Sequence, residues 1–288
     1  MITTSALQVR FGDTTALHPL DLDLPAGRIY GLLGRNGAGK TTLMSTLAGF
    51  RRPSAGTVSL DGVPVFDNAR ATSRICLIRD DGVLGDTTDT LRDILSMAAM
   101  MRPGFDRAWA ADLMDRFALP GKRWLRDLSR GQRSAFGVVV GLASRADLTM
   151  FDEAHLGMDA PGRQLFHEEL LRDYLEHPRT VILSTHLIEE QSPLFEQVLI
   201  LHEGRLLLRE DVDELRARGV SVTGPQQVVD DFVFGLTVLG ERRLGPTKQV
   251  TLFGALDEEH RQLARRYGLE LGPVALQELF IHLTGGAA

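Results

Sequence analysis

The sequence predicts an α/β fold followed by a smaller α+β region, and three observations carry this prediction. Short β-branched and aliphatic runs alternate with helical patterns through about residue 205. A purely helical stretch interrupts the alternation between residues 90 and 118, and a shorter alternation begins after "HEGRLLLRED". The strands expected in the first region are "ALQVRF" (6–11), "RIYGLL" (28–33), "TVSL" (57–60), "RICLI" (74–78), "LTMF" (148–151), "TVILS" (180–184) and "QVLIL" (197–201).

The helical stretch is expected to form an inserted subdomain of about residues 85–145. In "TLRDILSMAAMM" and "DRAWAADLMDRFAL", apolar residues recur at intervals of three and four, the spacing of an amphipathic helix. The second alternation contains a charged helix at 211–218, the strand-like runs "GVSVTGP", "GLTVLG" and "KQVTLFG", and a closing helix "PVALQELFIHL". We therefore expect a main domain at 1–210 and an accessory α+β domain at 211–288.

Composition narrows the classes of protein to be considered. Hydrophobic residues make up 43% of the 288 residues, which is ordinary for a globular protein with a core. The net charge of −6, with both signs well mixed, argues against a general nucleic-acid or anionic-lipid surface. Cys76 is the only cysteine, so an internal disulfide is excluded and a reducing compartment is expected. Neither a secretion signal nor an apolar run of about 18 residues is found, so we expect a soluble protein whose membrane role comes through a partner.

The stretch "GLLGRNGAGKTTL" (31–43) follows an apolar strand and leads into a helix, and it satisfies the pattern G-x-x-x-x-G-K-[ST]. Glycines let backbone N–H groups surround an anion, and the helix N-terminus adds a favourable dipole. Lys40 supplies a charge for the β- and γ-phosphates, and the Thr41 hydroxyl can ligate Mg²⁺. The expected nucleotide-binding residues are Gly34, Arg35, Asn36, Gly37, Ala38, Gly39, Lys40, Thr41 and Thr42.

Two further strands end in residues that suit phosphate hydrolysis. "ADLTMFDEAHLGMD" ends its apolar run at Asp152 and Glu153, of which the first can hold Mg²⁺ and the second can align and deprotonate water. "TVILSTHLIEE" places His186 just past another strand, where it would be catalytic by positioning the γ-phosphate or the water. Taken alone, acidic residues often end strands and a lone histidine is usually structural, so both functional assignments depend on the neighbouring phosphate loop.

The segment "LSRGQRS" (128–134) has two readings that its own letters leave open. Ser129 can cap its own helix, or Ser129 and Gly131 can bind a group brought to them. Four motifs follow one another along the chain: the phosphate loop, Ser-x-Gly-Gln, Asp-Glu and His. Because the ATP-binding-cassette (ABC) ATPases have these motifs in the same order, residues 3–210 resemble that family. "LSRGQ" is similar to their LSGGQ signature.

This resemblance implies a phosphate-loop (RecA-like) α/β core with antiparallel β strands and an inserted helical subdomain. It implies that two cassettes pair head to tail, so that Ser129, Gly131 and Gln132 bind ATP held by the partner chain. It also implies roles for Asp159, which ends the turn "AHLGMD", and for Phe11, which matches the aromatic that stacks on adenine. For Phe11, a strand aromatic in the core is the alternative.

Two departures from the family pattern stand out. Arg130 takes the second position of the signature that is usually glycine. In "ICLIRDDGV" (75–83), Asp80 stands where the family has a glutamine that contacts Mg²⁺ or water. We expect Asp80 to be a third metal-site residue beside Thr41 and Asp152, and an acidic surface turn is the alternative.

The resemblance favours the ATPase subunit of a bacterial exporter, with ATP and Mg²⁺ as cofactors. The expected partners are a second ATPase subunit, in a homodimer or heterodimer, and separately encoded transmembrane permease subunits; no nucleic acid is expected. Through the permease, the protein would lie on the inner face of the cell membrane. The alternatives are a soluble ABC ATPase acting on ribosomes or DNA, and a phosphate-loop kinase or GTPase. Transported substrates contact the membrane subunits, so the chain does not identify its cargo.

Overall fold

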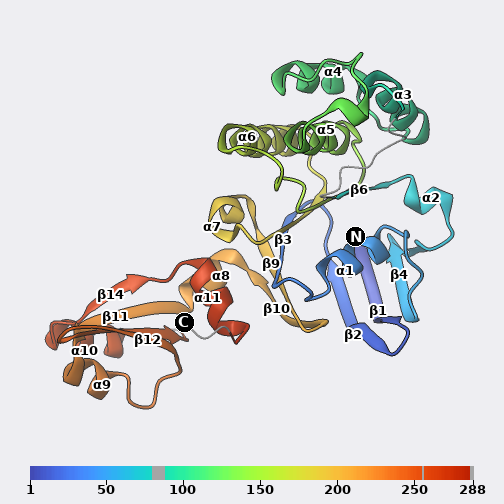
Figure 1. Cartoon of the computed structure of the whole chain (residues 1–288). Coiled ribbons are helices and arrows are strands. Elements are labelled where there is room, and N and C mark those ends of the chain that lie inside the picture. The colour runs from blue at the N-terminus through green and yellow to red at the C-terminus, as the bar shows by residue number, and fades with distance from the viewer. Residues whose placement is uncertain (80–87, 255, 286–288) are drawn as a thin grey trace. The chain divides into compact units, whose positions relative to one another are not determined.

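The computed structural model describes residues 1–79, 88–254 and 256–285 of the chain. Two compact units make up the protein (Figure 1). The N-terminal unit consists of Met1–His186 and Leu199–Leu208, and the C-terminal unit of Leu187–Val198 and Arg209–Ala288. The fold is α/β with several sheets, as predicted. Asp80 lies outside the described residues. Within the described ranges, no helix has the length and apolar character needed to cross a bilayer.

An antiparallel sheet opens the N-terminal unit, with strands β1 (Ile2–Phe11), β2 (Thr14–Leu24), β4 (Ala55–Leu60) and β5 (Val63–Pro64) in the order β2-β1-β4-β5. Gly12, with a φ of 58°, turns the chain between β1 and β2 so that Phe11 pairs with Thr14. Strand β2, whose run contains Pro19, was not predicted from the sequence. Because β2 lies at the sheet edge, the proline leaves no inner ladder bond unmade.

A second sheet carries the motifs. Its strands are β3 (Ile29–Gly34), β6 (Ile75–Arg79), β7 (Leu148–Asp152), β8 (Thr180–Thr185), β9 (Gln197–His202) and β10 (Arg205–Asp211), in the order β10-β9-β3-β8-β7-β6. Strands β3, β8, β7 and β6 are parallel neighbours, and every residue of β3, β7 and β8 is buried. Continuous apolar runs are typical of a parallel sheet covered on both faces. The carboxyl ends of β3, β7 and β8 therefore meet at one edge, where ligands bind in open α/β sheets.

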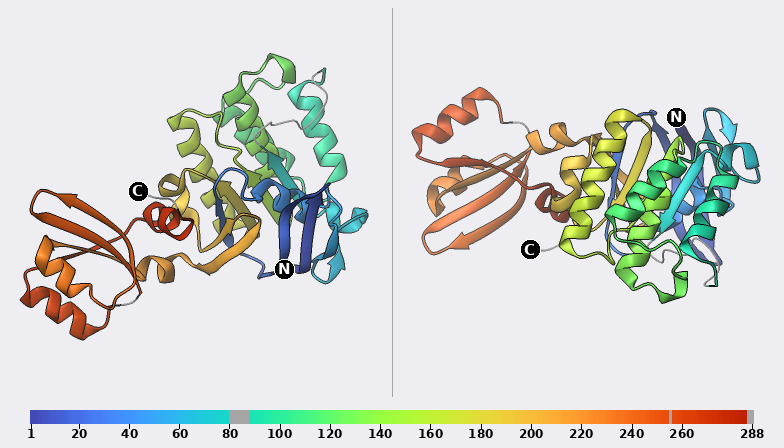
Figure 2. Two further views of the ribbon diagram at one scale, coloured as in Figure 1. Left: turned by 60° about the horizontal axis from the view of Figure 1, so that its bottom comes forward. Right: turned by 90° about the horizontal axis from the view of Figure 1, so that it is seen from above.

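Helices cover both faces of this sheet (Figures 1 and 2). Helix α1 (Lys40–Leu47) packs on β3 and β7, and α5 (Arg130–Ala143) packs on β6 and β7. At Gly141 of α5, a Cβ atom would lie 2.5 Å from the Phe151 ring, so the helix approaches the sheet closely. The remaining helices of the N-terminal unit are α2 (Ala69–Thr72), α3 (Leu91–Met101), α4 (Arg107–Arg116), α6 (Ala160–Glu176) and the 3₁₀ turn η1 (Leu125–Asp127).

Helices α3, α4 and α5 contact one another and form the helical insertion that the sequence predicted. Polar residues begin each of them: Thr90 accepts a bond from Asp93 N–H in a capping box, and Asp106 accepts one from Trp109 N–H at 2.9 Å. This backbone donor lowers the pKa of the Asp106 carboxyl below its ordinary value of 3.8. Apolar spacing located these helices in the sequence, and the structure adds the caps that begin them.

The C-terminal unit contains a four-stranded antiparallel sheet of order β12-β13-β11-β14. Along the chain, β11 (Gly219–Pro225), α9 (Gln226–Phe232), β12 (Val238–Leu244), β13 (Thr247–Phe253), α10 (Glu258–Arg266) and β14 (Glu270–Pro273) form a split βαββαβ pattern. Val222, Val229, Phe232, Val250 and Leu252 are part of its core. The other helices are α7 (Ile188–Gln191), η2 (Ser192–Leu194), α8 (Val212–Ala217) and α11 (Leu276–Leu283).

The prediction of a strand at "GLTVLG" (235–240) placed it too early in the chain. Strand β12 begins at Val238 and continues through the charged residues Glu241, Arg242 and Arg243. Because β12 is an edge strand with most side chains exposed, backbone pairing to β13 and the turn at Gly245, with a φ of 59°, set its register. Hydrophobic alternation is weak in such a strand.

Candidate functional site

The phosphate loop (Gly34–Thr42) joins β3 to α1, and close packing explains its glycines. A Cβ atom at Gly34 would lie 2.8 Å from the Leu201 carbonyl oxygen, and one at Gly39 would lie 2.8 Å from Leu17 Cδ2. Gly37 and Gly39 also have φ values of 82° and 104°, a conformation that side chains rarely adopt. The loop can thus turn its backbone N–H groups toward an anion only with glycine at these positions.

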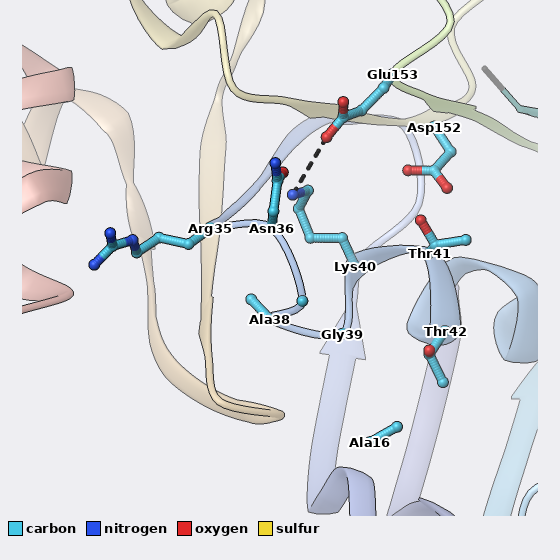
Figure 3. Close-up of a pocket in the computed structure, with 11 residues that line it drawn as sticks. Ala16, Arg35, Asn36, Ala38, Gly39, Lys40, Thr41, Thr42, Asp152 and Glu153 are labelled. Carbon is cyan, nitrogen blue, oxygen red and sulfur yellow. Dashed lines mark ion pairs between the residues drawn. The ribbon is translucent and has the colours of Figure 1, made fainter. Parts of the chain in front are cut away.

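A pocket of about 400 Å³ lies against this loop (Figure 3). Lys40 is 6% exposed, and its Nζ donates to the Gly34 carbonyl oxygen at 2.8 Å. The same Nζ lies 3.3 Å from Glu153 Oε1, the ion pair drawn in Figure 3. The pocket is lined by Ala16, Arg35, Asn36, Gly37, Ala38, Gly39, Lys40, Thr41, Thr42, Asp152 and Glu153.

Asp152 and Thr41 supply oxygen atoms to this pocket. Asp152, at the end of β7, is 5% exposed and accepts a hydrogen bond from Ser184 Oγ at 2.5 Å. Figure 3 shows the Thr41 hydroxyl directed toward the Asp152 carboxylate. One carboxylate and one hydroxyl fit a Mg²⁺ ion, which takes few protein ligands and completes its shell with substrate phosphates and water.

Glu153 is held between two basic groups. Its Oε1 faces Lys40, and its Oε2 lies 3.2 Å from His186 Nδ1. The backbone of Glu153 has a φ of 52°, which is strained for a residue with a side chain. Its N–H donates to Ser184, lying 3.2 Å from both the carbonyl oxygen and Oγ. The two strand ends predicted from the sequence are thus brought together at the phosphate loop.

The signature residues line a different pocket, of about 390 Å³. Ser129 caps α5: its hydroxyl accepts from Gln132 N–H at 3.2 Å, while Gln132 Oε1 accepts from Ser129 N–H at 3.1 Å. Asp159 caps α6 by accepting from Gly162 N–H at 3.0 Å. The pocket is lined by Phe117, Ser129, Gly131, Gln132, Ala135, Gly157, Met158, Asp159 and Gly162, and no described residue lines both pockets.

The remaining site predictions have different outcomes. Phe11 is 45% exposed, with the Arg51 guanidinium 4.2 Å from its ring centroid, so the alternative of a core aromatic is wrong. Asp80 lies outside the described residues, and its metal role stays a prediction. Sequence reasoning missed Ser184 and Ala16. Ser184 is opposite Asp152 in the parallel register of β7 and β8, a pairing that the local sequence does not encode.

Comparison with known proteins identifies the family. A family model described as "ABC transporter" matches residues 17–155. The daunorubicin resistance ATP-binding protein DrrA3 of Streptomyces coeruleorubidus is 30% identical over 310 residues, covering 99% of this chain and 96% of the relative. The chain belongs to the ABC transporter family. It is an ATP-hydrolysing nucleotide-binding subunit of an ABC transporter, which confirms the prediction made from the motifs and sets aside a kinase or a GTPase.

Other ABC transporter relatives match over most of the chain. The ATP-binding protein YtrB of Bacillus subtilis is 26% identical, covering 99% of both chains. A Nod factor export ATP-binding protein I of Burkholderia orbicola is 29% identical, covering 97% of this chain and 95% of the relative. Among solved structures, an ATP-binding subunit of an ABC transporter has a TM-score of 0.68 at 22% identity, covering 75% of this chain and 92% of that one. A dimeric cassette bound to ADP and Pi has a TM-score of 0.65 at 19% identity, covering 74% and 99%.

Proposed function

We propose that this ABC transporter subunit powers an exporter as one half of a head-to-tail dimer, each ATP lying between the phosphate loop of one chain and the signature of the other. The observation that carries the proposal is the separation of the two pockets. One has Lys40, Asp152 and Glu153 in its wall, and the other has Ser129 and Gly131 at a helix N-terminus. The names of relatives, which concern drug resistance, Nod factor export and bacitracin transport, support export.

The first pocket would bind the triphosphate. Lys40 Nζ has three N–H donors, and with Gly34 O and Glu153 as its partners it retains one for a phosphate oxygen. Thr41 and Asp152 would hold Mg²⁺, which neutralises negative charge on the phosphates. The exposed ring of Phe11 would stack on adenine.

Glu153 would act as the general base. Water attacks the γ-phosphorus, the bond to the β-phosphate oxygen breaks, and the Glu153 carboxylate accepts the proton of the water. His186 would position the carboxylate through the bond of 3.2 Å at Oε2. The strained φ of 52° at Glu153 directs the side chain into the pocket rather than along the strand.

The second pocket would complete the site of the partner chain. The Ser129 hydroxyl, the backbone at Gly131 and the dipole of α5 suit a γ-phosphate, and Gln132 and Asp159 lie beside them. Permease subunits would hold the dimer on the inner face of the cell membrane. In this proposal, residues 1–210 form the nucleotide-binding domain and 211–288 an accessory domain that ATP binding does not need.

Mixing two inactive variants of the full chain tests the dimer directly. Lys40→Ala removes the cation that faces the phosphates, and Ser129→Arg blocks the signature. In a mixed dimer, one site combines both defects and the other combines two intact halves. We expect each variant alone to be inactive and the mixture to recover up to about a quarter of the wild-type ATPase rate, because half of randomly formed dimers are mixed and each has one intact site. A mixture as inactive as its components would contradict the sharing of sites between chains.

A further inference from the structure

A buried histidine, His155, lies two residues after Glu153 in the chain. His155 belongs to the turn 153–159 between β7 and α6, and it is only 2% exposed. The turn is closed by bonds from Leu156 N–H to Glu153 O at 3.0 Å and from Met158 N–H to His155 O at 3.1 Å. A buried imidazole is costly unless its nitrogens are hydrogen bonded, so the residues bonded to it indicate what it holds in place.

One of these residues belongs to the strand that leads to His186. His155 Nε2 and Thr185 Oγ1 are hydrogen bonded at 3.2 Å, and Thr185 is fully buried. Thr185 is the last residue of β8 and directly precedes His186. The rings of His155 and His186 have centroids 6.4 Å apart. The bond therefore ties the turn that begins at Glu153 to the strand end that presents His186.

The backbone conformation of Glu153 explains what this hydrogen bond would stabilise. A non-glycine residue at a φ of 52° costs about 1–3 kcal/mol and persists only when its surroundings hold it in place. On the strand side, Ser184 accepts the Glu153 N–H. On the turn side, the side chain of His155 provides a second attachment to the same strand, so Glu153 lies between two points of fixation.

We propose that His155 is a positioning residue for ATP hydrolysis, which fixes the separation of Glu153 and His186 through its hydrogen bond with Thr185. The proposal rests on the roles assigned to Glu153 and His186 above. Hydrolysis needs Glu153 at the attacking water, whereas ATP binding depends on the phosphate loop. Loss of the His155–Thr185 bond therefore lowers kcat and leaves the affinity for ATP unchanged.

Four single variants test the bond from both ends. His155→Leu and Thr185→Val remove it at nearly constant volume; His155→Gln keeps a polar group near the position of Nε2, and Thr185→Ser keeps the hydroxyl. We expect the His155→Leu and Thr185→Val variants to have a kcat lower by about tenfold to a hundredfold, since small misplacements of reacting groups have effects of this size. The Gln and Ser variants are expected to stay within about threefold of wild type, and the Kd for ATP is expected to be constant throughout.

The double variant His155→Leu/Thr185→Val is expected to be no slower than the worse single variant, because both remove one interaction. Thr149→Val is the control: it deletes a buried hydroxyl from β7 that donates to Ala146 O at 3.2 Å and accepts from Arg179 Nε at 3.3 Å, both away from Glu153 and His186, and its kcat should equal that of wild type. If His155→Leu fails to fold, Thr185→Val decides the question. Equal kcat values for His155→Gln and His155→Leu, or a loss of ATP affinity matching the loss of rate, would overturn the proposal.

Glu153→Gln separates this inference from the proposed function. Full ATPase activity in Glu153→Gln would remove the base assignment on which the inference rests. An inactive Glu153→Gln together with wild-type kcat in both His155→Leu and Thr185→Val would leave the proposed function intact and overturn the role of His155 alone.

Discussion

The pockets beside α1 and α5 are alike in size, at about 400 and 390 Å³, but differ in charge and in how the helix begins. Helix α1 starts after Gly39, which offers no side-chain cap to the first N–H groups. Helix α5 starts at Ser129, whose hydroxyl accepts the Gln132 N–H. Of the described residues that line the second pocket, Asp159 is the only charged one, whereas the first has Lys40 among its lining.

The two helix N-termini therefore differ in how they can interact with a phosphate. The uncapped end of α1 leaves backbone donors for an anion and adds a buried cation, so it can bind phosphates by itself. At the capped end of α5 the Gln132 N–H is already hydrogen bonded, and none of the described residues that line the second pocket is a cation, so in the proposed dimer this end would add to a phosphate that the first pocket already holds.

Glu153→Gln is expected to lower kcat between about a hundredfold and ten-thousandfold, because the amide keeps the shape of the carboxylate and cannot accept the proton. ATP affinity should be unchanged. Steady-state ATPase rates and equilibrium nucleotide binding measure the two quantities, and size-exclusion chromatography with ATP should show a trapped dimer. Wild-type turnover would show that the first pocket does not use Glu153 as its base.

Lys40→Ala is expected to weaken ATP binding by about tenfold to a hundredfold, since hydrogen bonds to charged groups contribute about 1.5–3 kcal/mol. Arg35→Ala is the matched control: this residue lines the same pocket, but Figure 3 shows its side chain directed away from Lys40. Titration with a fluorescent ATP analogue compares the two. If both variants lost ATP affinity equally, the total positive charge of the pocket, and not the position of Lys40, would determine ATP binding.

Asp152→Asn is expected to raise the Mg²⁺ concentration for half-maximal ATPase activity by about tenfold, because an amide oxygen is a weaker ligand than a carboxylate. ATPase assays over a Mg²⁺ titration measure the shift. Asp159→Asn, which changes the charged residue of the second pocket, should leave the Mg²⁺ dependence as in wild type. If both variants raised the Mg²⁺ concentration for half-maximal activity, Mg²⁺ binding would not depend on the first pocket alone.

Ser129→Ala and Thr90→Ala compare two capping boxes in the helical insertion. Each loses an N-cap hydroxyl, so each is expected to reduce the free energy of unfolding by about 1 kcal/mol. Only Ser129→Ala should also lower the ATPase rate, because only Ser129 lies in a pocket that would meet a phosphate. Urea denaturation and ATPase assays measure the two effects. If Ser129→Ala loses stability but no activity, Ser129 is a helix cap only.

Features that depend on residues close together in the chain were predictable from the sequence. The phosphate loop was predictable because its glycine positions, Lys40 and Thr41 act within one strand–loop–helix unit. The helices at 91–101 and 107–116 were predictable from apolar spacing, and the structure adds the caps at Thr90 and Asp106 that begin them. Ser129 was recognised both as a cap and as a signature residue, and its cap is present.

Which of these segments meet depends on the order of the strands in the folded chain. Strand β8 lies between β3 and β7, an order that places Ser184 against Asp152 and His186 against Glu153 although about thirty residues separate each pair in the chain. The exposure of Phe11, the edge position of β2 with Pro19 and the polar strand β12 were likewise beyond the sequence pattern. The physical reason is common to all of them: strand order and burial depend on contacts between distant segments, and hydrophobic periodicity records only which face of a segment is buried, not what covers it.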